Sequence, residues 1–207
     1  MILPREFYMR DTLTVARELL GQILVHETPE GVTAGIIVET EAYLGKLDDA
    51  AHSYKKSTKR VQVQYEGKGL AYVYRIYGLH FCMNVTSGAT DAPEAILLRA
   101  LEPLEGTELM SRRRRTDRLR NLCAGPGKLS QALGITMDCY GADLTRPGGL
   151  YLLRGEAPGQ VLASRRIGVA YAEKCRDALW RFTVAGSPFV SVPADDEKRE
   201  KRQIRGK

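Results

Sequence analysis

The 207-residue sequence has no long hydrophobic run, and no stretch approaches the about 18 consecutive apolar residues that a membrane-spanning helix needs. Its first residues also lack the basic region and the apolar core of a signal peptide. We therefore expect no membrane partner and a cytoplasmic location. With 43% hydrophobic and 27% charged residues, the composition is that of a globular protein able to bury a sizeable core.

Cysteine is scarce and scattered. The four cysteines, at positions 82, 123, 139 and 175, form no CxxC pair, which argues against a zinc site or a disulfide framework. The HExxH and HxE…PCxxC motifs of zinc enzymes are absent, and GPGK at 125–128 lacks the spacing and the Ser/Thr of a Walker motif. We predict neither a bound metal nor a cofactor.

Positive charge is in excess, with a net charge of +6, and it is clustered at residues 55–60, 112–120 and 198–207. Clustered positive charge suits a polyanion, because each neutralised phosphate releases condensed counterions. The pattern favours a nucleic-acid partner, although a solvated face or a disordered tail explains the last cluster equally well. We expect one domain over residues 1–194 and a charged, frayed tail over 195–207.

Residues 36–45, IIVETEAYLG, form an apolar run that leads into two carboxylates and an aromatic ring. In a strand, alternate residues share a face, so Glu39, Glu41 and Tyr43 are expected to point the same way. Carboxylates at the end of a buried strand need a charge partner, a hydrogen bond or water. A functional cleft and a buried ion pair therefore both remain open for this segment.

Periodicity and turn residues predict a chain of mixed helices and strands. Asp11 precedes a helical pattern as an N-cap, and Gly21 stops it. A long polar connection without a clear pattern follows at 45–69. We expect a turn at 103–106, a helix after that turn, and a further short helix that is opened by residues 122–128 and ends at Gly134. Strands are expected at 22–26, 32–43, 70–77, 80–86, 95–101, 150–153, 167–170 and 179–184.

Three features of these elements call for partners outside their own strand or helix. Tyr77 falls at or beside the tip of the 70–86 hairpin, where a large ring loses burial unless it packs against another molecule. Arg99 interrupts an apolar strand and requires a buried partner. The helix that opens at Pro126 offers free backbone amides beside Lys128, which makes an anion site.

Aromatic rings, a strand-borne carboxylate and basic flanks together suit an enzyme that removes a base from the DNA stack and inserts a wedge in its place. Several short motifs occur in one order: VETEAYLG at 38–45, AHS at 51–53, YVY at 72–74, IYG at 76–78, CMN at 82–84, LLRALEP at 97–103, GP at 125–126, KL at 128–129, QAL at 131–133, RIGV at 166–169 and GSP at 186–188. Through them the chain resembles the alkyladenine (3-methyladenine) DNA glycosylase family over about residues 10–192.

The resemblance implies a role for each matched residue of the hydrolytic centre. Glu41 matches the general base that activates the hydrolytic water. Arg99 matches the arginine that helps to hold this water, and the backbone carbonyl of Ile167 would be a third contact. Glu39 would have a structural or supporting place. Because no lysine stands out as a Schiff-base nucleophile, we expect a monofunctional glycosylase without lyase activity.

The resemblance also implies the residues that would bind the damaged base. Tyr43, His52 and Tyr74 match an aromatic cage around the flipped base. Asn84 matches the side chain that crowds the exocyclic amine of normal guanine. Tyr77 matches the residue that fills the vacated stack. An aromatic cage attracts positively charged alkylated purines through its π faces.

The expected partner is double-stranded DNA that contains damaged purines of the 3-methyladenine, 7-methylguanine, hypoxanthine and ethenoadenine class, with an abasic site as the product. A monomer bound to the nucleoid through DNA is expected. Candidates for contacts with the DNA backbone are Lys59, Arg60, Arg112, Arg113 and Lys128. The TKRV sequence at 58–61 departs from the Thr-Pro-Arg-Asn-like run expected there. The implied fold is a compact α+β domain with a curved antiparallel sheet, flanking helices and a protruding β-hairpin.

Two other functions remain open. A carbohydrate glycosidase could use Glu39 and Glu41 as its acid and base pair. A non-enzymatic nucleic-acid-binding module would bind damaged DNA and leave it chemically intact. The basic clusters and the hairpin tyrosine argue against the first, and excision of damaged bases would exclude the second.

Overall fold

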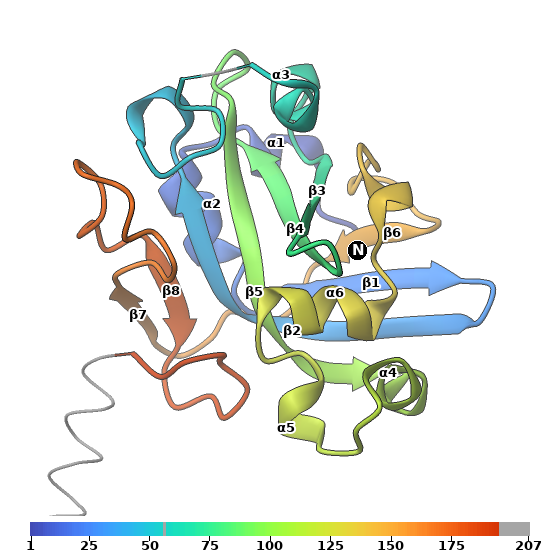
Figure 1. Ribbon diagram of the computed structural model, residues 1–207. Helices are drawn as coiled ribbons and strands as arrows, with labels where there is room; N and C mark the ends of the chain where they lie inside the picture. The colour runs from blue at the N-terminus through green and yellow to red at the C-terminus, as the bar shows by residue number, and fades with distance from the viewer. Residues whose placement is uncertain (56, 195–207) are drawn as a thin grey trace, which may run out of the picture.

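A computed structural model describes residues 1–55 and 57–194, and the expected tail at 195–207 lies outside this part (Figure 1). The expected α+β class is confirmed. The helices are α1 (Arg5–Tyr8), α2 (Thr12–Glu18), α3 (Val63–Glu66), α4 (Thr107–Arg114), α5 (Leu119–Leu122) and α6 (Pro126–Leu133). The strands are β1 (Ile23–Thr28), β2 (Gly31–Tyr43), β3 (Ala71–Ile76), β4 (His80–Ser87), β5 (Glu94–Glu105), β6 (Leu150–Leu153), β7 (Val161–Ser164) and β8 (Arg181–Val184).

The strands form one eight-stranded antiparallel sheet with the order β3-β4-β5-β2-β1-β6, to which β8 and β7 are added beside β2. β2 is the organising strand, because its first half pairs with β1 while residues 39–41 pair with β8. The register of β2 against β5 shifts on both sides of Glu39. Such bulges bend a strand and increase its twist, which lets β2 change partners along its length.

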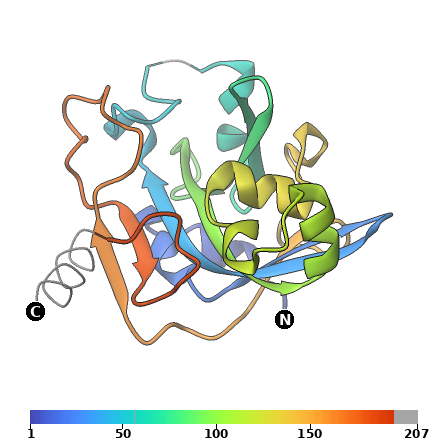
Figure 2. The same cartoon turned by 60° about the horizontal axis from the view of Figure 1, so that its bottom comes forward.

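Helices cover both faces of this sheet. α2 lies behind β2 and β5 in Figure 1 and α6 lies in front, and Figure 2 shows α4, α5 and α6 gathered on one side. The helix start at Asp11 is confirmed, since its carboxylate accepts the Thr14 N–H at 2.8 Å. Gly21 adopts a φ of +86°, and a Cβ there would lie 1.9 Å from the Glu156 carbonyl oxygen, so a glycine is required. In the described part of the chain, no helix is long and apolar enough to span a membrane.

The β3–β4 hairpin protrudes from the sheet as expected. Its tip is a tight turn in which the Leu79 N–H donates to the Ile76 carbonyl at 3.2 Å. Tyr77 and Gly78, the central residues, have φ values of 50° and 71°. Positive φ at both positions is the requirement of a type I′ turn, which favours Asn-Gly. A tyrosine in this conformation is strained, and Tyr77 is 92% exposed.

Four details of the predicted elements were wrong. Residues 167–170 form no strand, because Gly168 has a φ of +78° and the chain turns there. Residues 103–105 continue β5 instead of turning: Pro103 pairs with Gly35 of β2 and lies beyond the residues of β5 that pair with β4, and a strand tolerates proline where one of its sides is unpaired. β7, whose four residues carry no clear alternation, was not predicted, and β8 begins at Arg181 instead of Leu179.

Candidate functional site

A cavity of about 350 Å³ opens where β2 ends, between the β3–β4 hairpin and two loops. The first loop follows β2 and contributes residues 50–53, and the second contributes 167–169 and Tyr171. These loops lie side by side in both Figure 1 and Figure 2 although more than 100 residues separate them in the chain. Among the predicted site residues, the cavity is lined by Tyr43, His52, Arg60, Tyr74, Tyr77, Asn84, Arg99 and Ile167.

Glu41 lies directly behind the wall of this cavity and is fully buried. Its Oε1 accepts the Ile167 N–H at 2.7 Å, and its Oε2 accepts the Tyr43 hydroxyl at 2.9 Å. The Arg99 guanidinium reaches the same Oε2 at 3.4 Å. All three donors line the cavity, so the carboxylate is held by the groups that separate it from the opening. Ile167 contacts Glu41 through its N–H; the expected role of its carbonyl stays a prediction.

Glu39 is the other carboxylate of β2, and it forms the buried ion pair that the sequence left open. Its Oε1 accepts the Nε of Arg99 and the Nε of Arg181, both at 2.8 Å. Ser191 adds its N–H at 2.6 Å and its hydroxyl at 2.8 Å. Burial alone would raise the pKa of Glu39, but these partners outweigh it, and the pKa lies below its ordinary value. Both carboxylates therefore form buried ion pairs with Arg99, and Glu41 also lies behind the wall of a cleft.

Rings enclose the cavity. His52 and Tyr74 meet edge to face with centroids 4.8 Å apart, and Tyr72 lies 5.3 Å from Tyr74. The His52 Nδ1 is hydrogen-bonded to the Tyr72 hydroxyl at 2.8 Å. Burial, with a smaller contribution from the Arg60 charge, lowers the pKa of His52 to about 4, so the imidazole is neutral at neutral pH. Burial, followed by the Glu41 charge, raises the pKa of Tyr43, which keeps its hydroxyl as a donor.

Asn84 and Tyr77 occupy opposite ends of the hairpin. The Asn84 side chain is buried in β4 and donates to the Tyr72 carbonyl at 3.0 Å, which fixes its orientation at the cavity wall. Tyr77 stands at the exposed tip. One side chain is therefore held rigidly beside the cavity, and the other projects into solvent at its rim.

The basic candidates are less uniform than the sequence suggested. The Arg60 guanidinium lies 4.4 Å from the Tyr74 ring centroid, inside the site. Arg113 is tied to Glu30 at 2.7 Å and to the Ala132 carbonyl at 3.2 Å. Three candidates are exposed and do not line the cavity: Lys59, Arg112 and Lys128.

Sequence reasoning missed the Arg166–Asp48 ion pair, which connects the two cavity loops. Arg166 binds both carboxylate oxygens of Asp48, at 2.5 and 2.9 Å, and both side chains are fully buried. Its guanidinium lies 4.7 Å from the Tyr43 ring and 4.9 Å from the Trp180 ring. Because Arg166 immediately precedes Ile167, the pair fixes the segment that donates to Glu41. The RIGV motif contained this signal, but its partner, in the unpatterned connection, could not be inferred.

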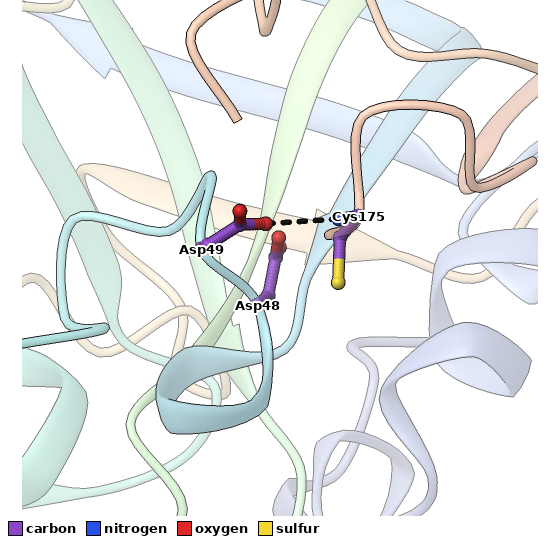
Figure 3. A group of neighbouring side chains, drawn as sticks. All are labelled: Asp48, Asp49 and Cys175. Atoms are coloured by element: carbon purple, nitrogen blue, oxygen red, sulfur yellow. Dashed lines mark hydrogen bonds between the residues drawn. The ribbon is translucent and has the colours of Figure 1, made fainter. Parts of the chain in front are cut away.

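Asp48, Asp49 and Cys175 come close enough together to resemble a metal-binding group (Figure 3). Asp49, however, accepts the N–H groups of Glu173, Lys174 and Cys175 at 2.7–2.9 Å, which lowers its pKa to about 2. The charge of Asp48 is already balanced by its ion pair with Arg166. Within the described residues, Asp48 and Asp49 therefore connect the two loops through hydrogen bonds, and their carboxylate oxygens are occupied by donors from the second loop.

Comparisons with known proteins agree on one family. The family profile described as methylpurine-DNA glycosylase matches residues 6–188. A protein from Methanoculleus marisnigri is 51% identical over 92% of this chain and 99% of its own length. A protein from Bacillus licheniformis is 48% identical over 91% of this chain and 96% of its own length. Both relatives carry the provisional name 3-methyladenine DNA glycosylase.

Proposed function

The chain belongs to the methylpurine-DNA glycosylase family, and on this premise we propose that it excises damaged purines from double-stranded DNA by hydrolysing the N-glycosidic bond. The family confirms the resemblance found in the sequence and supports a role in base-excision repair. The proposed substrates are alkylated and deaminated purines of the class named above, and the proposed product is an abasic site. The observation that carries this proposal is the Glu41 carboxylate, held by Tyr43, Arg99 and Ile167 at the wall of a ring-lined cavity.

The first step is extrusion of the damaged nucleotide. Enzymes that act on a base must rotate it out of the stack and hold it in a pocket. A cavity of about 350 Å³ lies within the range of small-ligand sites. Tyr77, exposed at the hairpin tip, would occupy the space that the base leaves. The rings of Tyr43, His52 and Tyr74 would then enclose the base.

The second step is attack of water on the anomeric carbon of the deoxyribose. Glu41 would accept a proton from this water, and the Tyr43 hydroxyl and the Ile167 N–H would keep the carboxylate oriented. Arg99 would hold the same carboxylate from a third side as its ion-pair partner. The electron pair of the broken C–N bond leaves with the purine, and the water oxygen becomes the hydroxyl of the abasic sugar. A cationic alkylated purine departs as a neutral base, whereas hypoxanthine must take up a proton as it departs.

A lyase step is not expected, since it needs a lysine amine at the sugar. No lysine of the described residues lines the cavity. Lys68, although buried, donates to the Gln64 and Ala92 carbonyls and is thereby held in the loop structure. The proposed enzyme is therefore monofunctional.

The carbohydrate-glycosidase alternative gains no support. It requires Glu39 as a general acid, whose pKa should be raised so that it carries a proton. Two arginines and Ser191 instead lower the pKa of Glu39 and occupy its oxygens. Glu39 is better explained as the partner that holds Arg99.

One assay tests the proposed activity. Duplexes with a single hypoxanthine, ethenoadenine or 7-methylguanine are incubated with the protein, and abasic sites are then cleaved with alkali. The proposal predicts strand breaks only at the lesion and only after alkali. Breaks before alkali would indicate a lyase, and binding without any breaks would support the non-enzymatic module.

A further inference from the structure

The base cavity already contains a cation that does not belong to the hydrolytic centre. Arg60 lies in a short 3-10 turn at Lys59–Val61. Its guanidinium lies 4.4 Å from the Tyr74 ring centroid, and the residue lines the cavity. After burial, the Arg60 charge is the second cause of the low pKa of His52, which places this charge beside the ring cage.

Arg60 differs from the other cavity arginine in how its charge is balanced. Arg99 is paired with Glu39 and Glu41. No carboxylate among the described residues lies within salt-bridge distance of Arg60, which stacks on the Tyr74 ring and makes a side-chain hydrogen bond with Tyr72. The cavity therefore has one balanced and one unbalanced positive charge, and the unbalanced one is stacked on a ring of the cage.

We propose that Arg60 is a specificity-determining residue that favours neutral damaged purines, such as hypoxanthine, over cationic ones, such as 7-methylguanine. This inference rests on the proposed function and refines it. An aromatic cage alone attracts a cationic base. Here a guanidinium already uses the face of one cage ring, so a second cation must share that ring with a like charge.

Two physical effects of Arg60 both favour a neutral purine over a cationic one. If a base with a unit charge lies about 8 Å from Arg60, in a medium between protein and water, repulsion changes its rate of excision relative to a neutral base about 2- to 30-fold. Arginine also binds the O6 and N7 acceptors of a purine in a bidentate manner. Hypoxanthine keeps both acceptors, whereas methylation of N7 removes one and adds the positive charge. Arg60 is exposed, so solvent screening reduces the first effect but not the second.

The test compares two lesions in otherwise identical duplexes. Single-turnover excision rates are measured for hypoxanthine and 7-methylguanine with the unmodified protein and with Arg60→Gln. We expect Arg60→Gln to raise the ratio of the 7-methylguanine rate to the hypoxanthine rate about tenfold. Arg60→Lys keeps the charge and should stay nearer to the unmodified ratio. The matched control is Lys59→Gln, which removes the same charge from the adjacent residue outside the cavity and should leave the ratio unchanged, even if both rates fall.

Two results would overturn the proposal. One is a rate ratio in Arg60→Gln within twofold of the unmodified protein. The other is an equal loss for both lesions together with a weaker salt dependence of DNA binding, which would make Arg60 a phosphate contact. Excision of neither lesion by the unmodified protein would instead remove the proposed function itself, so the two failures are distinguishable.

Discussion

The Tyr43 hydroxyl donates to the Glu41 carboxylate at 2.9 Å. The two residues are two positions apart in β2 and therefore share one face of the strand. This bond connects the rings of the cavity to the proposed hydrolytic centre, because Tyr43 lines the cavity while Glu41 lies behind it. The two-residue period of a strand therefore places Tyr43, the ring proposed to enclose the nucleobase, beside Glu41, the candidate general base.

The turn that carries Tyr77 should be more stable without tyrosine. Asn tolerates a positive φ better, and the exposed ring contributes little burial to the free protein. We expect Tyr77→Asn to raise the free energy of unfolding by about 1 kcal/mol, measured by urea denaturation. The same variant should lose about 1–3 kcal/mol of affinity for a lesion-bearing duplex. Leu79→Asn, in the same turn without a positive φ, should show no gain in stability. Unaltered duplex affinity in Tyr77→Asn would argue against a wedge.

The buried Arg166–Asp48 pair should dominate the stability of the cavity loops. Asp48→Asn leaves the buried Arg166 charge without its counter-ion, and we expect a loss of about 3–5 kcal/mol in the free energy of unfolding. Asp117→Asn, an exposed position, should change it by less than about 0.5 kcal/mol. A loss below about 1 kcal/mol for Asp48→Asn would mean that the Tyr43 and Trp180 rings stabilise the buried Arg166 charge without the Asp48 carboxylate.

Stability should depend on pH through histidine. In the unfolded chain His52 binds a proton near its ordinary pKa of 6.5, whereas in the folded protein it does so near 4. The unfolded state therefore binds more protons between these values, and stability should fall as the pH is lowered from 6.5 towards 4. Burial lowers the pKa of His26 as well, so His26 should also make the folded protein less stable as the pH is lowered. Denaturation midpoints at several pH values should show a shallower fall in His52→Asn, and an identical fall would assign the effect to other groups.

Salt dependence should separate two neighbouring arginines. Arg112 is exposed, whereas Arg113 is held by Glu30 and by the Ala132 carbonyl. If Arg112 contacts phosphate, Arg112→Gln should reduce the slope of log affinity against log salt by about 1. Arg113→Gln should mainly lower stability. Equal slopes for the unmodified protein and Arg112→Gln would place the phosphate contacts elsewhere.

Local rules predicted much of the fold and of the cavity. The period of β2, the N-cap at Asp11 and the break at Gly78 follow from neighbouring residues. The buried pair of Asp48 with Arg166 does not, because ion pairs over 118 residues have no local signature. The position of Arg60 over Tyr74 was also unpredicted, since the loop that carries it has no periodic pattern. The motifs predicted residues that line one cavity, and long-range contacts determine how the charges of that cavity are balanced.

The most direct test of the account is single-turnover excision by Glu41→Gln. Removing the carboxylate while keeping its size should slow excision of hypoxanthine about 100- to 10,000-fold and leave affinity for the lesion-bearing duplex unchanged. Glu105→Gln, an exposed change at the end of β5, should excise at the unmodified rate. Excision by Glu41→Gln at the unmodified rate would contradict the assignment of Glu41 as the base.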